Sequence, residues 1–130
     1  MIALDSSVLV RYLTQDDPSQ GASAARFLEE ELTADRPGFV SVIVLCEVSW
    51  VLRRGYRFSR SQVQTALRAL LGIRQLTFGD LAFVERAVSS NDQDIADFLI
   101  HELGRAAGCA ETVTFDRRFA RVQGVRLLGG

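Results

Sequence analysis

Four carboxylates of this 130-residue chain are surrounded by apolar residues in the sequence instead of lying in polar runs. They are Asp5 after "IAL", Glu47 within "VIVLCEVSWVL", Asp97 within "IADFLI" and Asp116 after "VTF". Two carboxylates about 4 Å apart repel by about 4 kcal/mol at an effective dielectric of about 20. A cluster of such groups therefore takes up protons or holds a cation. Oxygen ligands without histidine or cysteine favour Mg²⁺ or Mn²⁺.

Glu47 poses the sharpest problem, because its apolar surroundings indicate a core-forming segment. An isolated ionised acid taken out of water costs several kcal/mol. Glu47 must therefore reach solvent, be held neutral or lie beside positive charge, and a bound metal ion would supply that charge. Each of the four acids, taken alone, also has an ordinary structural explanation as a cap, a turn residue or a surface acid. If the four acids have no shared function, four separate structural explanations are needed, which favours a common role.

Short apolar segments alternate with segments of helical periodicity along the chain. This pattern predicts a single α/β domain over residues 1–130, with a central, mostly parallel five-stranded sheet in a three-layer α/β/α arrangement. The predicted strands are residues 2–4, 39–41, 73–78, 111–116 and 125–128. The predicted helices are residues 6–13, 19–32, 42–54, 59–71, 80–90, 93–108 and 117–123.

Residues that favour helix ends mark several of these boundaries. Ser41 is expected to cap the helix that Gly55 ends, and Asp92 or Asp94 is expected to cap the helix that contains Asp97. Parallel sheets bind ligands beyond the carboxyl ends of their strands. Asp5 and Asp116 follow predicted strands, so both are expected at one rim of the sheet, with Asp97 directed toward its edge.

The composition excludes some kinds of chemistry. All fifteen basic residues are arginine, so no mechanism can use a catalytic or phosphate-clamping lysine, whereas guanidinium groups suit phosphate. No segment approaches the roughly 20 apolar residues of a membrane-spanning helix, and the first residues lack the pattern of a secretion signal. Cys46 and Cys109 are isolated, which indicates reduced thiols and a cytoplasmic protein without a zinc site.

Four segments together carry a resemblance to a known family. They are "IALDSSVLVRYL", "SVIVLCEVSWVL", "DIADFLIHELGRAAGC" and "TVTFDRRFAR", in this order. The chain resembles the PIN-domain nucleases, and especially the VapC-type toxins of type II toxin–antitoxin systems. The resemblance implies an endoribonuclease that depends on Mg²⁺ or Mn²⁺, a homodimer, and a cognate antitoxin protein that blocks the site.

The resemblance also implies roles for individual residues. Asp5 and Asp97 would be the principal metal ligands, and Asp116 and Glu47 would complete the catalytic set, with one metal ion or two left open. Ser7 stands where many relatives carry asparagine, and Thr114 matches a polar position close to the pocket. Both are expected to support the ligands.

Arginines near the expected site are candidates for RNA binding. Arg117, Arg118 and Arg121 follow Asp116, while Arg53 and Arg54 precede "GYRF", a mixture suited to phosphates and unstacked bases. A solvated helix end explains this second group equally well. His101, the single histidine, is expected to pack or to be solvated in preference to acting as a base.

Two other functions fit parts of the pattern. A non-catalytic PIN-fold module for binding or dimerisation would keep the fold without cleaving RNA, although retention of all four acids argues against it. An aspartyl-phosphate phosphatase or receiver-type domain also places an aspartate after its first strand. Such domains normally use a lysine, and this chain contains none. They often also have a second acid two residues after the first, and "DSSVL" lacks it.

Overall fold

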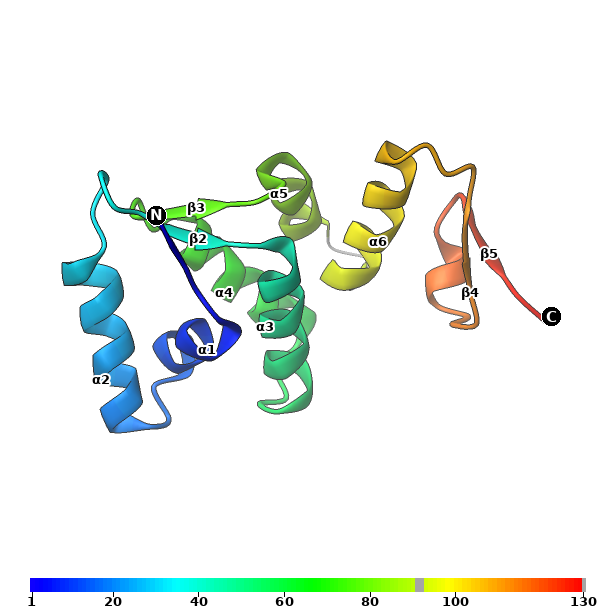
Figure 1. Ribbon diagram of the computed structural model, residues 1–130. Helices are drawn as coiled ribbons and strands as arrows, with labels where there is room; N and C mark the ends of the chain where they lie inside the picture. Colours follow the sequence, from blue (N-terminus) through cyan, green and yellow to red (C-terminus); the bar gives the residue numbers. More distant parts are fainter. Residues whose placement is uncertain (91–92, 130) are drawn as a thin grey trace. The chain divides into compact units, whose positions relative to one another are not determined.

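The computed structural model describes residues 1–90 and 93–129. The chain divides into two compact units, Met1–Leu81 and Ala82–Gly130. The first unit contains a parallel sheet in the order β1 (Ile2–Ala3), β2 (Gly38–Val40) and β3 (Leu76–Phe78) (Figure 1). Because the strands are parallel, their carboxyl ends share one edge of this sheet.

The middle strand of this sheet is closely surrounded at its first residue. A Cβ atom on Gly38 would lie 2.6 Å from Leu4 Cδ1, and 2.9 Å from methyl carbons of both Leu32 and Leu76. Only glycine fits this position without displacing its neighbours. The close approach lets β2 pair with β1 on one side and with β3 on the other.

Helices connect these strands. They are α1 (Ser6–Thr14), α2 (Pro18–Arg26), a π-helical turn η1 (Phe27–Glu31), α3 (Val42–Arg54) and α4 (Arg60–Leu71). The first helix packs against α2 and α3, and α3 packs against α4. Apolar side chains from these helices form the core of the unit, among them Leu9, Leu28, Leu45, Val48, Leu52, Leu67 and Leu70.

Capping residues explain where the helices begin and end. The Ser41 hydroxyl accepts a hydrogen bond from the Val44 N–H, and the helix that follows ends before Gly55, which confirms the predicted bounds of α3. Ser59 and Gln62 form a reciprocal capping box at the start of α4. The predicted helix 19–32 instead comprises α2 and η1, and a bond from Leu32 N–H to the Phe27 carbonyl closes the wider last turn.

The second unit contains nearly all of α5 (Leu81–Ser89), together with α6 (Ile95–Ala106), β4 (Thr112–Thr114), a 3₁₀ turn η2 (Phe119–Arg121) and β5 (Val125–Leu127). Its two strands pair in parallel, with Thr112 opposite Val125. Asp94 caps α6 by accepting a hydrogen bond from the Ala96 N–H, and it is one of the two residues predicted as the cap. Asp92, the other, lies outside the described residues. An ion pair of 3.3 Å between Arg86 and Glu102 links α5 to α6.

Five strands appear near their predicted positions, and their parallel pairing confirms the α/β class. Four of them are shorter than expected, because flanking residues form turns, and β2 has the expected three residues but begins one position earlier. In β3, for example, the Leu76 N–H bonds the Ile73 carbonyl, so residues 73–75 lie outside the strand. The five strands form one sheet of three and one of two, so a single five-stranded sheet between two helical layers is not shown. None of the helices formed by the described residues has the length and apolar character needed to cross a bilayer.

Candidate active site

Asp5 lies between β1 and α1, at the carboxyl edge of the three-stranded sheet. Its extended backbone makes it the N-cap of α1, and its Oδ2 atom accepts hydrogen bonds from the Ser7 hydroxyl at 2.7 Å and the Ser7 N–H at 3.4 Å. These bonds stabilise the charged form, so the Ser7 hydroxyl first, and then its backbone N–H, lower the pKa of Asp5. The exposed carboxylate is therefore ionised at neutral pH.

A pocket of about 510 Å³ adjoins Asp5 and is formed by the end of β1 together with α1 and α2. Its walls are mainly apolar, with Leu4, Val8 and Phe27 among them, and Arg11 lies at its border. The pocket places a charged group next to a hollow that can take an apolar or aromatic part of a ligand.

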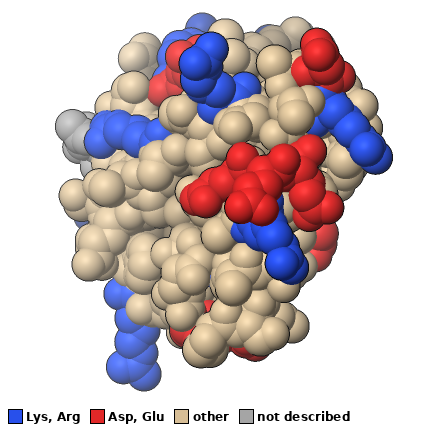
Figure 2. All heavy atoms as spheres, turned by 90° about the vertical axis from the view of Figure 1, so that its left-hand side faces the viewer, with Lys and Arg blue, Asp and Glu red and all other residues tan. Residues whose placement is uncertain are grey.

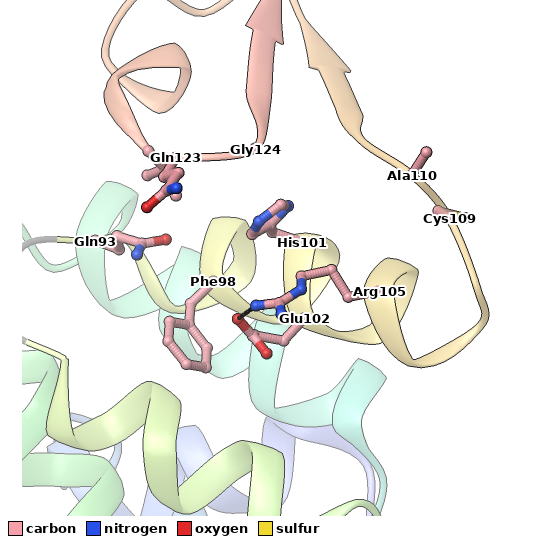
Figure 3. Close-up of a pocket in the computed structure, with 10 residues that line it drawn as sticks. Gln93, Phe98, His101, Glu102, Arg105, Cys109, Ala110, Gln123 and Gly124 are labelled. Carbon is pink, nitrogen blue, oxygen red and sulfur yellow. Dashed lines mark hydrogen bonds and ion pairs between the residues drawn. The ribbon is translucent and has the colours of Figure 1, made fainter.

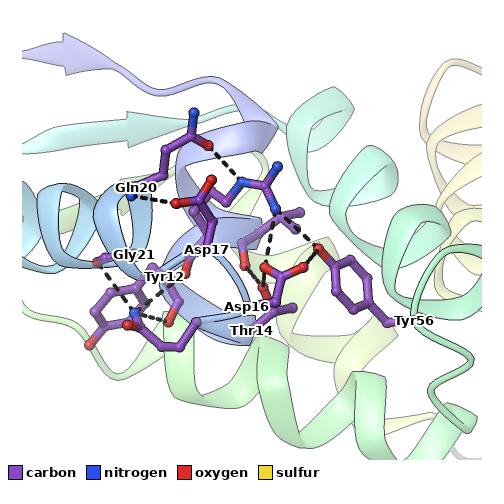
Figure 4. A network of polar contacts seen from close by, with 10 residues as sticks. Tyr12, Thr14, Asp16, Asp17, Gln20, Gly21 and Tyr56 are labelled. Carbon is purple, nitrogen blue, oxygen red and sulfur yellow. Dashed lines mark hydrogen bonds and ion pairs between the residues drawn. The ribbon is translucent and has the colours of Figure 1, made fainter.

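The Arg11 guanidinium is held by three segments of the first unit. Its Nε donates to Gln20 Oε1 at 2.7 Å, and its Nη1 donates to Asp16 Oδ1 at 3.1 Å and to the Tyr56 hydroxyl oxygen at 3.3 Å. Figure 4 shows Tyr56 in turn donating to Asp16, at 2.7 Å. This hydrogen bond is the main reason that the pKa of Asp16 is lowered. The network fixes Arg11 and does not leave it as a free cation for phosphate.

Glu47 is exposed, so of the three alternatives for this acid the structure favours the one in which its carboxylate reaches solvent. The buried face of α3 carries Leu45, Val48 and Leu52, and Glu47 lies on a different face of the helix. Ser49, the other polar residue in the apolar run, is the buried one. Glu47 therefore reaches solvent, and no cation is needed to make it tolerable on this helix.

Asp97 is half-buried in the first turn of α6. Its backbone N–H donates to the Asp94 carboxylate at 3.3 Å, beside the stronger bond of 2.9 Å from Ala96 N–H. Acidic side chains are favoured at this end of a helix, where the macrodipole is positive. Asp97 therefore lies in the turn of α6 where an acidic side chain is favourable.

Asp116 follows β4 and forms a turn with its own carboxylate. Its Oδ1 accepts hydrogen bonds from the backbone N–H groups of Arg118 at 2.8 Å and Phe119 at 3.2 Å. The Asp116 N–H donates to the Thr114 hydroxyl at 3.0 Å, so Thr114 fixes the backbone that carries the acid. The structural explanation of Asp116 as a turn residue is correct, and it leaves the second carboxylate oxygen without a hydrogen bond from any described residue.

The four acids are divided between the two units: Asp5 and Glu47 belong to the first, and Asp97 and Asp116 to the second. Within either unit taken alone, the described residues include no group of three or more histidine, cysteine, aspartate or glutamate side chains that could hold a metal ion. A joint cluster of the four acids therefore stays a prediction.

The candidate RNA-binding arginines differ in their surroundings. Arg117, Arg118 and Arg121 are exposed, and none forms an ion pair with a carboxylate among residues 1–90 and 93–129. Arg53 instead donates to the Phe58 carbonyl at 3.2 Å, and the Arg54 guanidinium lies 5.7 Å from the ring centroid of Trp50. The structure thus gives this second pair of arginines intramolecular roles.

Acidic side chains also gather on one face of the first unit. Figure 2 shows such a group on the side where α2 lies in Figure 1. The exposed Glu29, Glu30 and Glu31 follow α2 in the chain. Like charge makes a face of this kind unfavourable for a phosphate backbone.

His101 is buried, and its Nδ1 lies 2.8 Å from the Thr112 hydroxyl. This contact ties α6 to β4 and gives the histidine a packing role, in line with the expectation. No pattern in the sequence indicates a role for Arg11 or Gln93, because a single polar residue near a helix end is common. Their significance lies in contacts that only the folded chain reveals.

Comparison with known proteins identifies the family. No curated protein matches the chain. The family model described as PIN domain matches residues 2–125, a span that begins in β1, ends at the first residue of β5 and contains all four candidate acids. PIN domains are in general nucleases. Because the match covers nearly the whole length, the chain belongs to the PIN domain family.

Proposed function

We propose that the protein is a metal-dependent endoribonuclease that hydrolyses RNA phosphodiester bonds and acts as the toxin of a toxin–antitoxin pair. The observation that carries the proposal is the family match, which spans all four acids. The environment of Asp5 supports it: an exposed carboxylate with a lowered pKa follows a parallel strand, where α/β sheets bind their ligands.

The chemistry of the acids fits a hard divalent cation. The second carboxylate oxygen of Asp116 accepts no hydrogen bond from the described part of the chain, and Asp5 has, besides its two bonds to Ser7 at Oδ2, only a minor interaction with the Ser6 N–H, so each acid can offer an oxygen as a ligand. In this proposal Asp5 and Asp97 hold Mg²⁺ or Mn²⁺, with Asp116 and Glu47 completing the site directly or through water. The bound ion would lower the pKa of water toward neutrality and neutralise charge that develops on the phosphate.

The remaining residues orient these groups and attract the substrate. Ser7 lowers the pKa of Asp5 through its hydroxyl and orients the carboxylate, and Thr114 fixes the turn that presents Asp116. Arg117, Arg118 and Arg121 provide positive charge next to Asp116 in the sequence, which favours binding of the phosphate backbone. Hydrolysis by an activated water needs no protein nucleophile and no lysine, in agreement with the composition.

Cleavage of cellular RNA tests the enzymatic part of the proposal. Purified protein, freed of any antitoxin, is incubated with mixed cellular RNA and Mn²⁺ or Mg²⁺. We expect discrete fragments that disappear with EDTA and with Asp97→Asn. Metal should also raise the melting temperature of the parent, by an amount set by its concentration relative to the Kd, and raise it much less in the variant. Absence of both cleavage and metal stabilisation would contradict the proposal.

The toxin role and its partners require a second experiment. Induced expression of the parent is expected to arrest growth of the host cells, and Asp97→Asn is expected to permit growth at the same protein level. The proposed homodimer is checked by light scattering of the purified protein. Growth arrest by the variant equal to that by the parent would contradict a toxic effect through RNA cleavage.

A non-catalytic binding module is the second candidate, and one observation favours it. Asp5 and Asp116 both cap the turn or helix that follows them, so each has a structural reason to be an acid. Such a module would show no metal-dependent cleavage and equal thermal stability with and without Mn²⁺. The same metal titration therefore distinguishes the two functions.

A further inference from the structure

The second unit contains two pockets that share a border. One, of about 420 Å³, is lined by residues of α6 and of the segments before β4 and β5, including Phe98, His101 and Arg105 (Figure 3). The other, of about 470 Å³, is lined by Arg118 and Arg121. Gln93, Val122 and Gln123 line both pockets. Each volume lies in the range of small-molecule sites, about 300–1,000 Å³.

The first pocket lies at the end of β4 opposite to the end that Asp116 follows. His101, which lines the first pocket, contacts Thr112 at the amino end of β4 and lies close to Gly124 just before β5. Asp116 instead follows the carboxyl end of β4. Gly124 has φ = +88°, and a Cβ there would lie 3.1 Å from the His101 ring. Glycine at this position keeps the segment beside His101 free of a side chain.

Gln93 supplies an unsatisfied acceptor at the shared border. Its Oε1 atom is buried and has no hydrogen-bond partner among the residues that the structure describes. Figure 3 shows the Gln93 carboxamide extending into the space between Gln123 and Phe98. A buried acceptor without a donor costs free energy, so a rotation of the carboxamide that turns this atom toward the pocket and lets a ligand N–H reach it would be favourable.

Three chemical features thus meet around one side chain: a carboxamide with an unused acceptor, an aromatic ring, and two arginines without ion pairs among the described residues. A carboxamide pairs with the amino and ring-nitrogen edge of adenine through two hydrogen bonds. Aromatic rings support unstacked bases of single-stranded RNA, and arginine binds its phosphates. Uracil lacks an exocyclic amine and can offer Gln93 Oε1 only its ring N3–H, and its single ring covers less of an aromatic face than the two rings of adenine.

From this arrangement we infer that the second unit carries a base-reading subsite for single-stranded RNA, in which Gln93 recognises adenine and Arg118 and Arg121 bind the adjoining phosphate. The inference rests on RNA as the substrate proposed above. It adds a specificity determinant that lies outside the four acids and takes no part in bond cleavage.

Binding of short fluorescent oligo(A) and oligo(U) to the full-length protein tests the subsite. Anisotropy is measured in EDTA, so that no cleavage occurs and the result does not depend on a metal. The parent is expected to bind oligo(A) on the order of tenfold more tightly than oligo(U). Gln93→Leu should reduce this ratio to near one. Gln75→Leu, the same change at a half-buried glutamine of the first unit, should leave it unchanged.

Double replacement of Arg118 and Arg121 by alanine separates base reading from phosphate binding. It should weaken both oligonucleotides by the same factor and reduce the dependence of binding on salt, while the preference for oligo(A) persists. Melting temperatures of all variants are measured to compare only folded proteins.

The outcomes also separate this inference from the proposed enzyme. Equal binding of oligo(A) and oligo(U) by the parent, no binding of either, or an unchanged preference in Gln93→Leu would each overturn the subsite. Metal-dependent cleavage can still occur in all three cases. Conversely, a preference for oligo(A) that is lost in Gln93→Leu supports the subsite even if the cleavage assay is negative.

Discussion

Asp5 and Asp116 occupy equivalent positions in their two units and are held in different ways. Each follows a short parallel strand and accepts two hydrogen bonds at one carboxylate oxygen. For Asp5, both donors belong to Ser7, and the shorter bond comes from a side chain. For Asp116, both donors are backbone N–H groups of the turn that follows. The lowered pKa of Asp5 therefore depends mainly on the identity of residue 7, whereas the position of Asp116 depends on the path of the chain.

Replacing each acid by asparagine should have the largest effect. Asparagine keeps an oxygen that can accept the capping bonds, so Asp5→Asn and Asp116→Asn are expected to fold. Each should reduce RNA cleavage by more than the roughly 10- to 100-fold that loss of an outer supporting residue costs. Cleavage rates with Mn²⁺ are compared with those of Asp35→Asn, an exposed acid outside the candidate site, which should behave as the parent. Full activity of Asp116→Asn would make Asp116 a turn residue only.

Removing the Ser7 hydroxyl tests the side-chain support of Asp5. In Ser7→Ala the pKa of Asp5 should rise toward its ordinary value of 3.8, because its main stabilising hydrogen bond is lost. Affinity for Mn²⁺ should fall about tenfold. The pH below which protonation of Asp5 weakens Mn²⁺ binding should also become higher. Ser7→Asn, which keeps a donor, is the control. The idea fails if Ser7→Ala titrates and binds metal as the parent does.

The sign of the stability change follows from the direction of this shift. A carboxyl whose pKa is lowered by folding stabilises the folded state above its unfolded pKa, and this contribution is lost as the pH falls through the folded pKa. The difference in unfolding free energy between parent and Ser7→Ala should thus be constant near neutral pH and disappear in acid.

Thr114→Val should have a smaller effect than Ser7→Ala. The lost bond supports the backbone N–H of Asp116, and the carboxylate keeps both of its own donors. We expect a loss of about 1 kcal/mol in unfolding free energy and only a severalfold decrease in cleavage. Chemical denaturation and cleavage rates measure the two effects. A decrease in cleavage as large as that of Asp116→Asn would show that Thr114 contacts the substrate or the metal.

Tyr56→Phe should have the smallest effect on function, and it separates a lowered pKa from a catalytic role. Asp16 also has a lowered pKa, but its causes are Tyr56, Thr14 and Arg11, which together connect α1 to the loop after α3. The variant should raise the pKa of Asp16 and lower the melting temperature slightly, with the difference closing as the pH falls through that pKa. Cleavage should be unchanged, and a large decrease would extend the active site to this network.

The sequence predicted helix α3 to the residue, because Ser41 and Gly55 are strong local signals. The prediction was less accurate for η1, where the Leu32 N–H bonds the carbonyl five residues earlier, as in a π-helix. The spacing of apolar residues alone does not distinguish a π-helical turn from an α-helical one. The strand-end positions of Asp5 and Asp116 were also predictable. The exposure of Glu47 was one of three alternatives left open, because the apolar run around it does not show which face of the helix is buried. The open acceptor of Gln93 depends on tertiary contacts, which no local pattern encodes.

The position of Trp50 gives the protein a built-in optical probe. It is the single tryptophan, it is 60% exposed on α3, and it stands three residues after Glu47, so the two side chains share one face of the helix. Indole emission depends on the polarity around the ring. Any metal ion, RNA or protein partner that binds over this face will change the emission of one assigned residue, so occupancy of the Glu47 side of the first unit can be followed in solution without a label.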